Sequence, residues 1–177
     1  MQAVDPHKAR RGTNGVTTLH DDISAFLATY FEAWNGYDVP AMRSLWDESE
    51  ENATYLAEEC EPHHGWDEIL AYWGVDRSKS ERLLTWHDLH VTQASDDVAI
   101  AFFHANWSTY IPDNRLYPKP FGGPVRITMV LRKTAAGWRA IHYAESPLAS
   151  IVQLREAHEA AVDPALHERL AAKGIRY

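Results

Sequence analysis

A ten-residue stretch near the end of the chain, WRAIHYAESP at residues 138–147, brings a histidine, a tyrosine and a glutamate close together. Its aromatic start, its β-forming residues and its final proline predict a strand. Alternation with period two divides the side chains between two faces, with Trp138, Ala140, His142 and Ala144 on one and Arg139, Ile141, Tyr143 and Glu145 on the other. The chemistry of the stretch therefore depends on which face lines a cavity.

Glu145 and His142 are the candidate catalytic residues of this stretch. In an apolar cavity the charged form of Glu145 would be desolvated, so its pKa would rise toward values that suit a general acid or base. Tyr143 on the same face could donate a hydrogen bond to a substrate oxygen. If the opposite face lines the cavity, His142 becomes the general base, because the ordinary pKa of histidine lies near neutral pH. The structural alternatives are that Glu145 pairs with Arg126 or Arg139, and that His142 packs in the sheet or in an interface.

A second stretch with ligand-binding character is AFFHANW at residues 101–107, which also alternates as a strand. One face carries Phe103, Ala105 and Trp107, and the other carries Phe102, His104 and Asn106. Aromatic side chains with a small residue between them would suit a flat ligand, and they would equally suit a core packed against helices.

The sequence predicts no metal site and no cofactor. Ten histidines are present, but neighbours such as His63 and His64 point to opposite sides of a strand, and so do His87 and His90. The chain has no HExxH motif, no cysteine pair, no glycine-rich phosphate loop and no dinucleotide fingerprint. Cys60 stands among glutamates, whose charge disfavours a reactive thiolate. Cofactor-free acid–base chemistry on a small molecule is therefore the enzymatic activity that we expect.

The composition is that of one acidic globular domain of 177 residues, of which 45% are hydrophobic and 24% charged. The net charge of −8 argues against nucleic acid as a partner, since binding phosphates needs clustered lysine and arginine. No apolar run approaches the roughly 18 residues of a membrane span, and the first residues lack the apolar core of a signal peptide. We therefore expect no membrane partner and a cytoplasmic location. Seven Trp, eight Tyr and five Phe suit a large core or an aromatic-lined pocket.

Helical periodicity comes first along the chain and strand periodicity follows it. The predicted helices cover residues 19–34, 38–46 and 66–73, and the predicted strands cover 53–58, 83–94, 98–110, 125–134 and 138–145. A stiff loop with four prolines is expected at 111–124, a polar flexible tail at 1–17, and two helices after Pro147 and Asp163. This order predicts an α+β domain with helices packed on one face of a curved sheet.

Three motifs placed on these elements resemble the nuclear transport factor 2-like superfamily, and within it the SnoaL-like (polyketide-cyclase-like) proteins. They are AWNGYD at residues 33–38, EPHHGWDEI at 61–69 and GWRAIHYAES at 137–146. The resemblance implies a cone-shaped, strongly curved antiparallel sheet with the N-terminal helices packed on its concave face and a pocket inside the cone. It further implies a domain at residues 18–150, a C-terminal helical extension at 151–177, and a homodimer formed through the outer face of the sheet.

The last strand also looks like that of the calmodulin-dependent kinase association domain, although that domain has a second histidine where this chain has Ala144. On this analogy Tyr143 and Glu145 face the cavity and His142 faces the dimer side, and Glu58 or Glu59 lies near the mouth of the cone. The residues expected to contact a ligand are Tyr30, Trp34, Tyr55, Trp73, His104, Trp107, Met129 and Tyr143.

The resemblance implies a small-molecule ligand, because the fold carries isomerases, dehydratases, cyclases and hydrolases as well as modules without catalysis. We expect an acid–base enzyme that acts on an apolar or aromatic substrate. The alternative is a non-catalytic ligand-binding or oligomerisation module on the same fold.

Overall fold

A computed structural model describes residues 18–76, 79–112, 115, 118–147, 159 and 162–175. Its elements are α1 (Leu19–Gly36), α2 (Val39–Ser44), β1 (Thr54–Leu56), β2 (His63–His64), α3 (Gly65–Trp73), β3 (Glu81–Gln93), β4 (Val98–Tyr110), β5 (Phe121–Thr134), β6 (Gly137–Pro147) and α5 (Pro164–Ala172). The predicted tail at 1–17 and the helix expected after Pro147 lie outside the described residues. None of the residues of α5 is buried.

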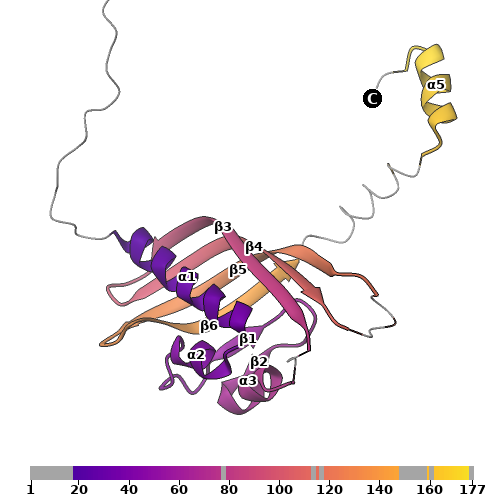
Figure 1. Ribbon diagram of the computed structural model, residues 1–177. Coiled ribbons are helices and arrows are strands. Elements are labelled where there is room, and N and C mark those ends of the chain that lie inside the picture. Colours follow the sequence, from indigo (N-terminus) through magenta and orange to yellow (C-terminus); the bar gives the residue numbers. More distant parts are fainter. Residues whose placement is uncertain are drawn as a thin grey trace, which may run out of the picture.

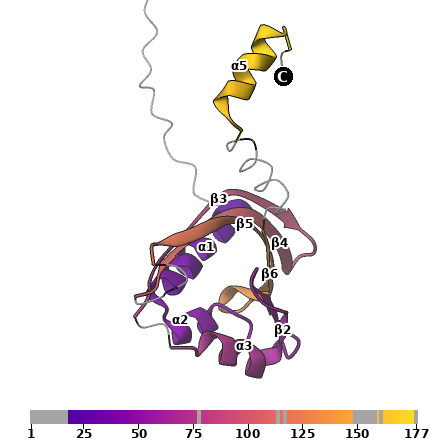
Figure 2. The ribbon, with the colours of Figure 1, turned by 90° about the vertical axis from the view of Figure 1, so that its right-hand side faces the viewer.

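The strands form one six-stranded sheet in the order β2-β1-β6-β5-β4-β3. The four long strands pair antiparallel with their sequence neighbours, as the sequence predicted. β1 instead lies parallel to β6, so the sheet as a whole is mixed. The sheet curls around α1, while α2 and α3 lie below its open end (Figures 1 and 2). The α+β fold with helices on a concave face is therefore confirmed.

Helix α1 is stabilised at its start and buries one side in the concave face of the sheet. A capping box fixes its first turn: Thr18 Oγ1 accepts a hydrogen bond from Asp21 N at 3.2 Å, and Asp21 Oδ2 accepts one from Thr18 N at 3.1 Å. The buried stripe of the helix consists of Ile23, Phe26, Leu27, Tyr30, Phe31, Ala33 and Trp34. This helix supplies much of the apolar core enclosed by the curved sheet.

Helix α1 ends at Gly36, two residues beyond its predicted end at residue 34. The residue that follows, Tyr37, has left-handed backbone, with φ of 49°. The Tyr37 hydroxyl donates a hydrogen bond to the carbonyl oxygen of Trp73 at 2.6 Å. Because left-handed backbone is unfavourable for a residue with a side chain, this tertiary bond helps to keep the turn in place.

A β-bulge in β6 changes the expected faces of its side chains. Ala140 and His142 each have a partner on β5, but the register shifts between them and Ile141 is the extra residue. Trp138 and Ala140 are buried before the bulge, and Tyr143 is buried after it. The expected division of this stretch is therefore wrong, because a bulge adds one residue and reverses the alternation. Tyr143 shares the inner side of the sheet with Trp138.

Strand β5 begins earlier than the sequence indicated. The prediction of a loop over residues 111–124 is wrong at its end, because β5 begins at Phe121, which pairs with β4, and not at Val125. A Cβ atom at Gly122 would lie 2.1 Å from the carbonyl oxygen of Trp107. Only glycine therefore permits this close approach of the two strands, and the glycine marks strand pairing and not a hinge.

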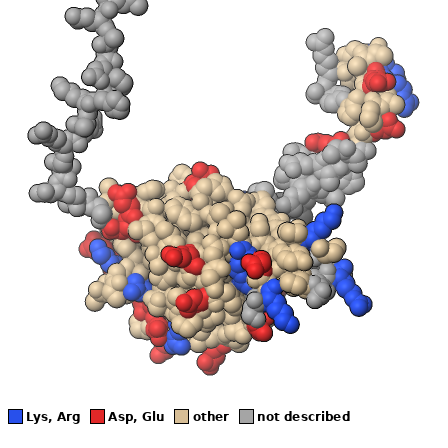
Figure 3. All heavy atoms as spheres, viewed as in Figure 1, with Lys and Arg blue, Asp and Glu red and all other residues tan. Residues whose placement is uncertain are grey.

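Both signs of charge occur on the face of the molecule seen in Figure 3, and acidic side chains interrupt the basic ones there. No continuous basic surface forms on that face. Among the residues that the structure describes, no helix has the length and the apolar character that crossing a membrane requires.

Asn35 joins the end of α1 to β3, the edge strand of the sheet. Its Nδ2 donates a hydrogen bond to the Leu84 carbonyl oxygen at 3.0 Å, and its Oδ1 accepts one from Leu84 N at 2.7 Å. The amide side chain thus takes the place of a neighbouring strand for one residue of β3. Leu84 also lines the cavity described below, so this contact fixes one of its walls.

Asn35→Ala leaves both backbone groups of Leu84 without their partner in a partly buried place. We expect a loss of about 1–3 kcal/mol in the free energy of unfolding, measured by urea denaturation. Asn106→Ala, which removes an exposed amide from the neighbouring strand, serves as the control and should change little. Equal stabilities of the two variants would show that the Asn35 bonds contribute nothing.

Candidate functional site

A cavity of 720 Å³ opens between α1, the segment that follows β1, α3 and the ends of β3 and β4. This volume falls within the roughly 300–1,000 Å³ of typical small-molecule sites. Its lining is mainly apolar and aromatic with a few charged groups: Tyr30, Phe31, Trp34, Tyr55, Ala57, Glu58, Glu59, Tyr72, Val75, Asp76, Lys79, Ser80, Arg82, Leu84, Trp107, Ser108, Thr109, Ile111, Pro112, Phe121, Tyr143 and Glu145. Residues from seven elements (α1, β1, α3, β3, β4, β5 and β6) and from three connecting segments therefore meet around one space.

Glu145 of β6 is held in the cavity wall by two donors. Its Oε1 accepts a hydrogen bond from the Tyr143 hydroxyl at 2.6 Å, and its Oε2 accepts one from the Glu58 N–H at 3.1 Å. Burial raises the pKa of Glu145 to about 7, against the lowering effect of these two hydrogen bonds. The negative charges of Glu59 and Glu58 raise it further. A carboxyl group in this state can take up or release a proton near neutral pH.

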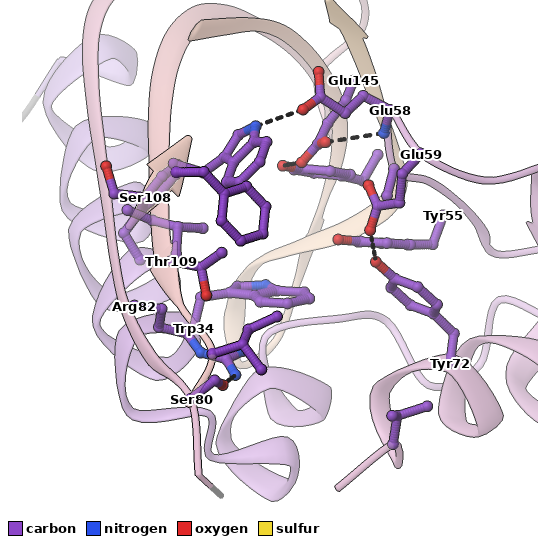
Figure 4. Close-up of a pocket in the computed structure, with 18 of the residues that line it drawn as sticks. Trp34, Tyr55, Glu58, Glu59, Tyr72, Ser80, Arg82, Ser108, Thr109 and Glu145 are labelled. Carbon is purple, nitrogen blue, oxygen red and sulfur yellow. Dashed lines mark hydrogen bonds between the residues drawn. The ribbon is translucent and has the colours of Figure 1, made fainter. Parts of the chain in front are cut away.

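Two more carboxylates from the segment after β1 lie near Glu145, as Figure 4 shows. Glu58 Oε1 accepts a hydrogen bond from the indole N–H of Trp107 at 2.5 Å. Burial raises the pKa of Glu58, although the bond from Trp107 lowers it. Glu59 accepts a hydrogen bond from the Tyr72 hydroxyl at 2.6 Å. The cavity thus has an acidic end in which each carboxylate has a defined donor.

Stacked aromatic rings form the wall beside the acidic end. Tyr143 lies on Tyr55 with ring centroids 4.9 Å apart and planes within 4°, and it also stacks on Tyr30 at 5.9 Å. Trp34 covers the other part of Tyr55 at 5.8 Å. Burial raises the pKa of all three tyrosines above its ordinary value, so they remain protonated near neutral pH. They are hydrogen-bond donors and apolar surfaces, and not bases.

Not every polar group buried in this wall has a hydrogen-bond partner. Within the described part of the chain, the buried hydroxyl of Tyr30 donates to no acceptor, while the indole N–H groups of Trp34 and Trp46 point to its oxygen and lower its pKa against the larger raising effect of burial. Buried donors are rarely left unpaired in proteins, because the loss of hydration is not recovered. The rings of Tyr30 and Trp34 line the cavity, but the Tyr30 hydroxyl itself is closed off from it by burial.

Charged side chains of both signs line the cavity in and before the start of β3, namely Asp76, Lys79 and Arg82. Arg82 and Ser80 lie across from Glu58 and Glu145 in Figure 4. The Arg82 guanidinium packs on the ring of Tyr37 at 4.0 Å and donates a hydrogen bond to Ser80 Oγ at 2.7 Å. The cavity therefore carries three glutamates at one end and Arg82 across from them, with aromatic rings among its other lining residues.

The structure gathers six of the residues proposed from the sequence around the cavity: Tyr30, Trp34, Tyr55, Trp107, Tyr143 and Glu145. Trp73 and Met129 are instead fully buried in the core, and His104 and His142 are not among the lining residues. His142 is partly buried outside the lining, where loss of hydration lowers its pKa.

The side chains around Glu145 also differ from the expected ones. The Tyr143 hydroxyl, expected to donate a hydrogen bond to a substrate oxygen, donates it to Glu145. Neither expected arginine reaches the carboxylate, since Arg126 bonds Ser146 and the carbonyl of Pro147, and Arg139 bonds the carbonyl of Trp138. Arg82 and Tyr72 were not predicted as lining residues, because neither stands in a motif and the fold alone brings them to the cavity.

Comparisons with known proteins agree on the class of fold. The profile of the SnoaL-like domain matches residues 23–150 of the chain. Among solved structures, a nuclear transport factor 2 (NTF2-like) superfamily protein from Salmonella enterica serovar Typhimurium is similar, with a TM-score of 0.62 and 20% identity over 72% of this chain and 89% of that one. A search of curated proteins by sequence found no match.

Two further solved structures show how widely the fold is used. A ketosteroid isomerase-like protein from Erwinia carotovora atroseptica aligns with a TM-score of 0.58 and 19% identity, over 73% of this chain and 96% of that one. The CaMKII hub homology domain of Chlamydomonas reinhardtii aligns with a TM-score of 0.60 and 17% identity, over 75% of this chain and 100% of that one. At these identities the likeness concerns the fold alone.

The chain has an NTF2-like fold, with a curved sheet around its first helix and a cavity inside. Within that class it belongs to the SnoaL-like domain family, since the match covers most of its length.

The raised pKa of Glu145 predicts how stability depends on pH. Between the ordinary value of 4.5 and the folded value of about 7, the folded chain keeps a proton that the unfolded chain releases. The stability that this proton contributes is complete at low pH and is lost as the pH rises through about 7. Glu145→Gln has no such loss, so its free energy of unfolding relative to the wild type should increase from about pH 5 to about pH 8, by at most about 3 kcal/mol.

Thermal or urea denaturation at several pH values measures this difference. Glu51→Gln, which changes an exposed glutamate, is the control and should show a difference that does not vary with pH. A constant offset for Glu145→Gln as well would mean that the carboxyl group titrates alike in the folded and the unfolded chain.

Proposed function

We propose that the chain is a cofactor-free acid–base enzyme that acts on a small apolar or aromatic molecule, with Glu145 as its proton-transferring group. The observation that carries this proposal is a single carboxyl group in the cavity wall, held by the Tyr143 hydroxyl and the Glu58 N–H, with its pKa raised to about 7. A general acid or base works best when its pKa lies near the working pH. The fold and family are compatible with this role without requiring it.

The neighbours of Glu145 fit the requirements of proton transfer. The Tyr143 and Glu58 donors fix the orientation of its carboxyl group, so that a substrate bound on the tyrosine wall meets it in a defined geometry. In its ionised form Glu145 would remove a proton from a carbon next to a carbonyl group. For an isomerisation the same group would return that proton to another carbon, and no cofactor is needed.

A dehydration would use a second carboxyl group. Glu145 would take the proton from carbon while Glu58, whose pKa is also raised, would give its proton to the departing hydroxyl, so that water leaves. The name of the ketosteroid isomerase-like relative supports chemistry of this class.

The charges of the cavity also limit the substrate. Aromatic walls favour a flat, apolar body, and the polar side chains Ser80 and Arg82 across from Glu145 favour a polar group on the far part of that body. Carboxylates near the reaction centre disfavour an anionic group there.

A β,γ-unsaturated ketone and a β-hydroxy ketone of aromatic or steroid-like size test the proposal directly. We expect the protein to turn over at least one of these compounds. The rate should rise with pH as Glu145 ionises, with the midpoint of the rise near pH 7. Glu145→Gln should lower kcat by at least about a hundredfold without abolishing ligand binding. Tyr143→Phe removes a donor that lowers the pKa of Glu145, so its pH midpoint should move upward.

Glu51→Gln is again the control and should leave kcat unchanged. If Glu145→Gln keeps full turnover, Glu145 is not the proton-transferring group. If no compound is turned over while ligands still bind in the cavity, the alternative of a non-catalytic ligand-binding module is correct. The hub homology domain among the similar folds supports that alternative and the oligomerisation role.

We further propose a homodimer through the outer face of the sheet. Leu83 of β3 and Ile100 and Phe102 of β4 are exposed there, at 59%, 36% and 38% of their surface. Exposed apolar groups on a face without covering helices are typical of an interface.

Light scattering on a size-exclusion column should give twice the 20.1 kDa mass of the chain. Phe102→Asp places a charge in the interface and should yield the monomer at micromolar concentration. Leu166→Asp, which alters an exposed leucine of α5, is the control and should leave the dimer intact. A wild-type particle of a single chain mass would overturn the dimer.

A further inference from the structure

A cluster of two histidines and an aspartate lies away from the cavity, on strands β3 and β4. His87 and His104 are direct partners across the two antiparallel strands, so their side chains share one face of the sheet. Their ring centroids are 5.4 Å apart. The side chains of His87, Asp88 and His104 are 51%, 65% and 41% exposed, and none of the three lines the cavity.

The backbone of β3 is shaped so that Asp88 joins the two histidines. In a regular strand the residue after His87 would point to the opposite face. Here the register shifts between His87 and His90, and Asp88 has φ of 54° in the left-handed region. The resulting bulge brings the Asp88 carboxylate to the side of the sheet on which His87 and His104 lie.

Two of the three distances within this group fit metal ligands and are too long for hydrogen bonds. Asp88 Oδ2 lies 3.6 Å from His87 Nε2 and 3.5 Å from His104 Nδ1, which is longer than the roughly 2.7–3.2 Å of a hydrogen bond. Ligands at about 2.1 Å around a tetrahedral zinc ion are separated by about 3.4 Å. One ligand atom from each of the three residues lies within 4.8 Å of the others.

We propose that His87, Asp88 and His104 bind one divalent transition-metal ion of the zinc type. Two imidazole nitrogens and a carboxylate oxygen are a donor set for Zn²⁺, Co²⁺ or Ni²⁺. Mg²⁺ and Ca²⁺ prefer oxygen ligands throughout and suit this set poorly. The ion joins β3 to β4 at the bulge, and its fourth position is open to water.

This site is independent of the acid–base chemistry, because it lies outside the cavity and uses none of its residues. It does lie close to Phe102, whose ring is 5.8 Å from that of His104, and therefore beside the proposed dimer interface. In a dimer the open position could be taken by a group of the second copy. The binding of the ion itself does not require that copy.

The test uses the full chain, freed of metals by a chelator and then dialysed. Titration with Zn²⁺ in a calorimeter should show one ion bound per chain, and Co²⁺ should give the strong visible absorption of a tetrahedral site. Saturating Zn²⁺ should raise the melting temperature, since an ion bound only by the folded chain stabilises it.

Three variants locate the ion. Asp88→Asn keeps a residue type that tolerates left-handed backbone but removes the charged ligand, and His104→Gln removes a nitrogen ligand. Each should weaken Zn²⁺ binding at least about tenfold. His90→Gln removes another exposed histidine of the same strand and should leave the affinity unchanged. Melting curves without metal establish that all variants fold.

Two results would overturn the proposal. One is a wild-type chain that binds neither Zn²⁺ nor Co²⁺. The other is an affinity that Asp88→Asn and His104→Gln leave intact, or that His90→Gln weakens equally, because the ion would then be bound by other histidines of the chain.

Discussion

The candidate site depends on the stacking of Tyr143 on Tyr55, in register across the parallel pair of β6 and β1. This contact fixes the short strand β1 against a long strand, and the segment that follows β1 then places Glu58 beside Glu145 near the end of β6. The Glu58 N–H reaches Glu145 only because the two strands run in the same direction. Without the stack, neither the donor to Glu145 nor the acidic end of the cavity would have a defined position.

That arrangement balances two opposing effects on one carboxyl group. Burial among aromatic rings disfavours the charged form of Glu145, while the Tyr143 hydroxyl and the Glu58 N–H favour it. Stronger burial alone would leave a carboxylic acid that never ionises near neutral pH, and more donors would leave a carboxylate that never takes a proton. A pKa of about 7 results from both effects together.

Regular periodicity in the sequence predicted the regular parts of the fold. The apolar stripe of α1 and the alternation in β3 to β6 were sufficient to expect helices on one face of a curved sheet, and the motif resemblance added the cone and its cavity. The parts that could not be predicted depend on contacts between distant residues. Tyr37 adopts a left-handed turn, and its hydroxyl donates a hydrogen bond to the carbonyl of Trp73. Arg82 lines the cavity because β3 pairs with β4.

The two bulges explain the remaining differences and connect both sites. Each bulge adds a residue to a strand of the bent sheet, so the parity of the residues that face inward changes there. In β6 the inward residues are Trp138 and Ala140 before the bulge and Tyr143 after it. In β3 they are Trp86 before the bulge and Leu89 after it. A prediction from strict alternation has no place for an extra residue. It therefore put His87 and His90 on opposite faces and found no ligand partner for His87. Because bulges also bend and twist a sheet, the curvature that encloses the cavity and the turn that presents Asp88 have the same physical cause.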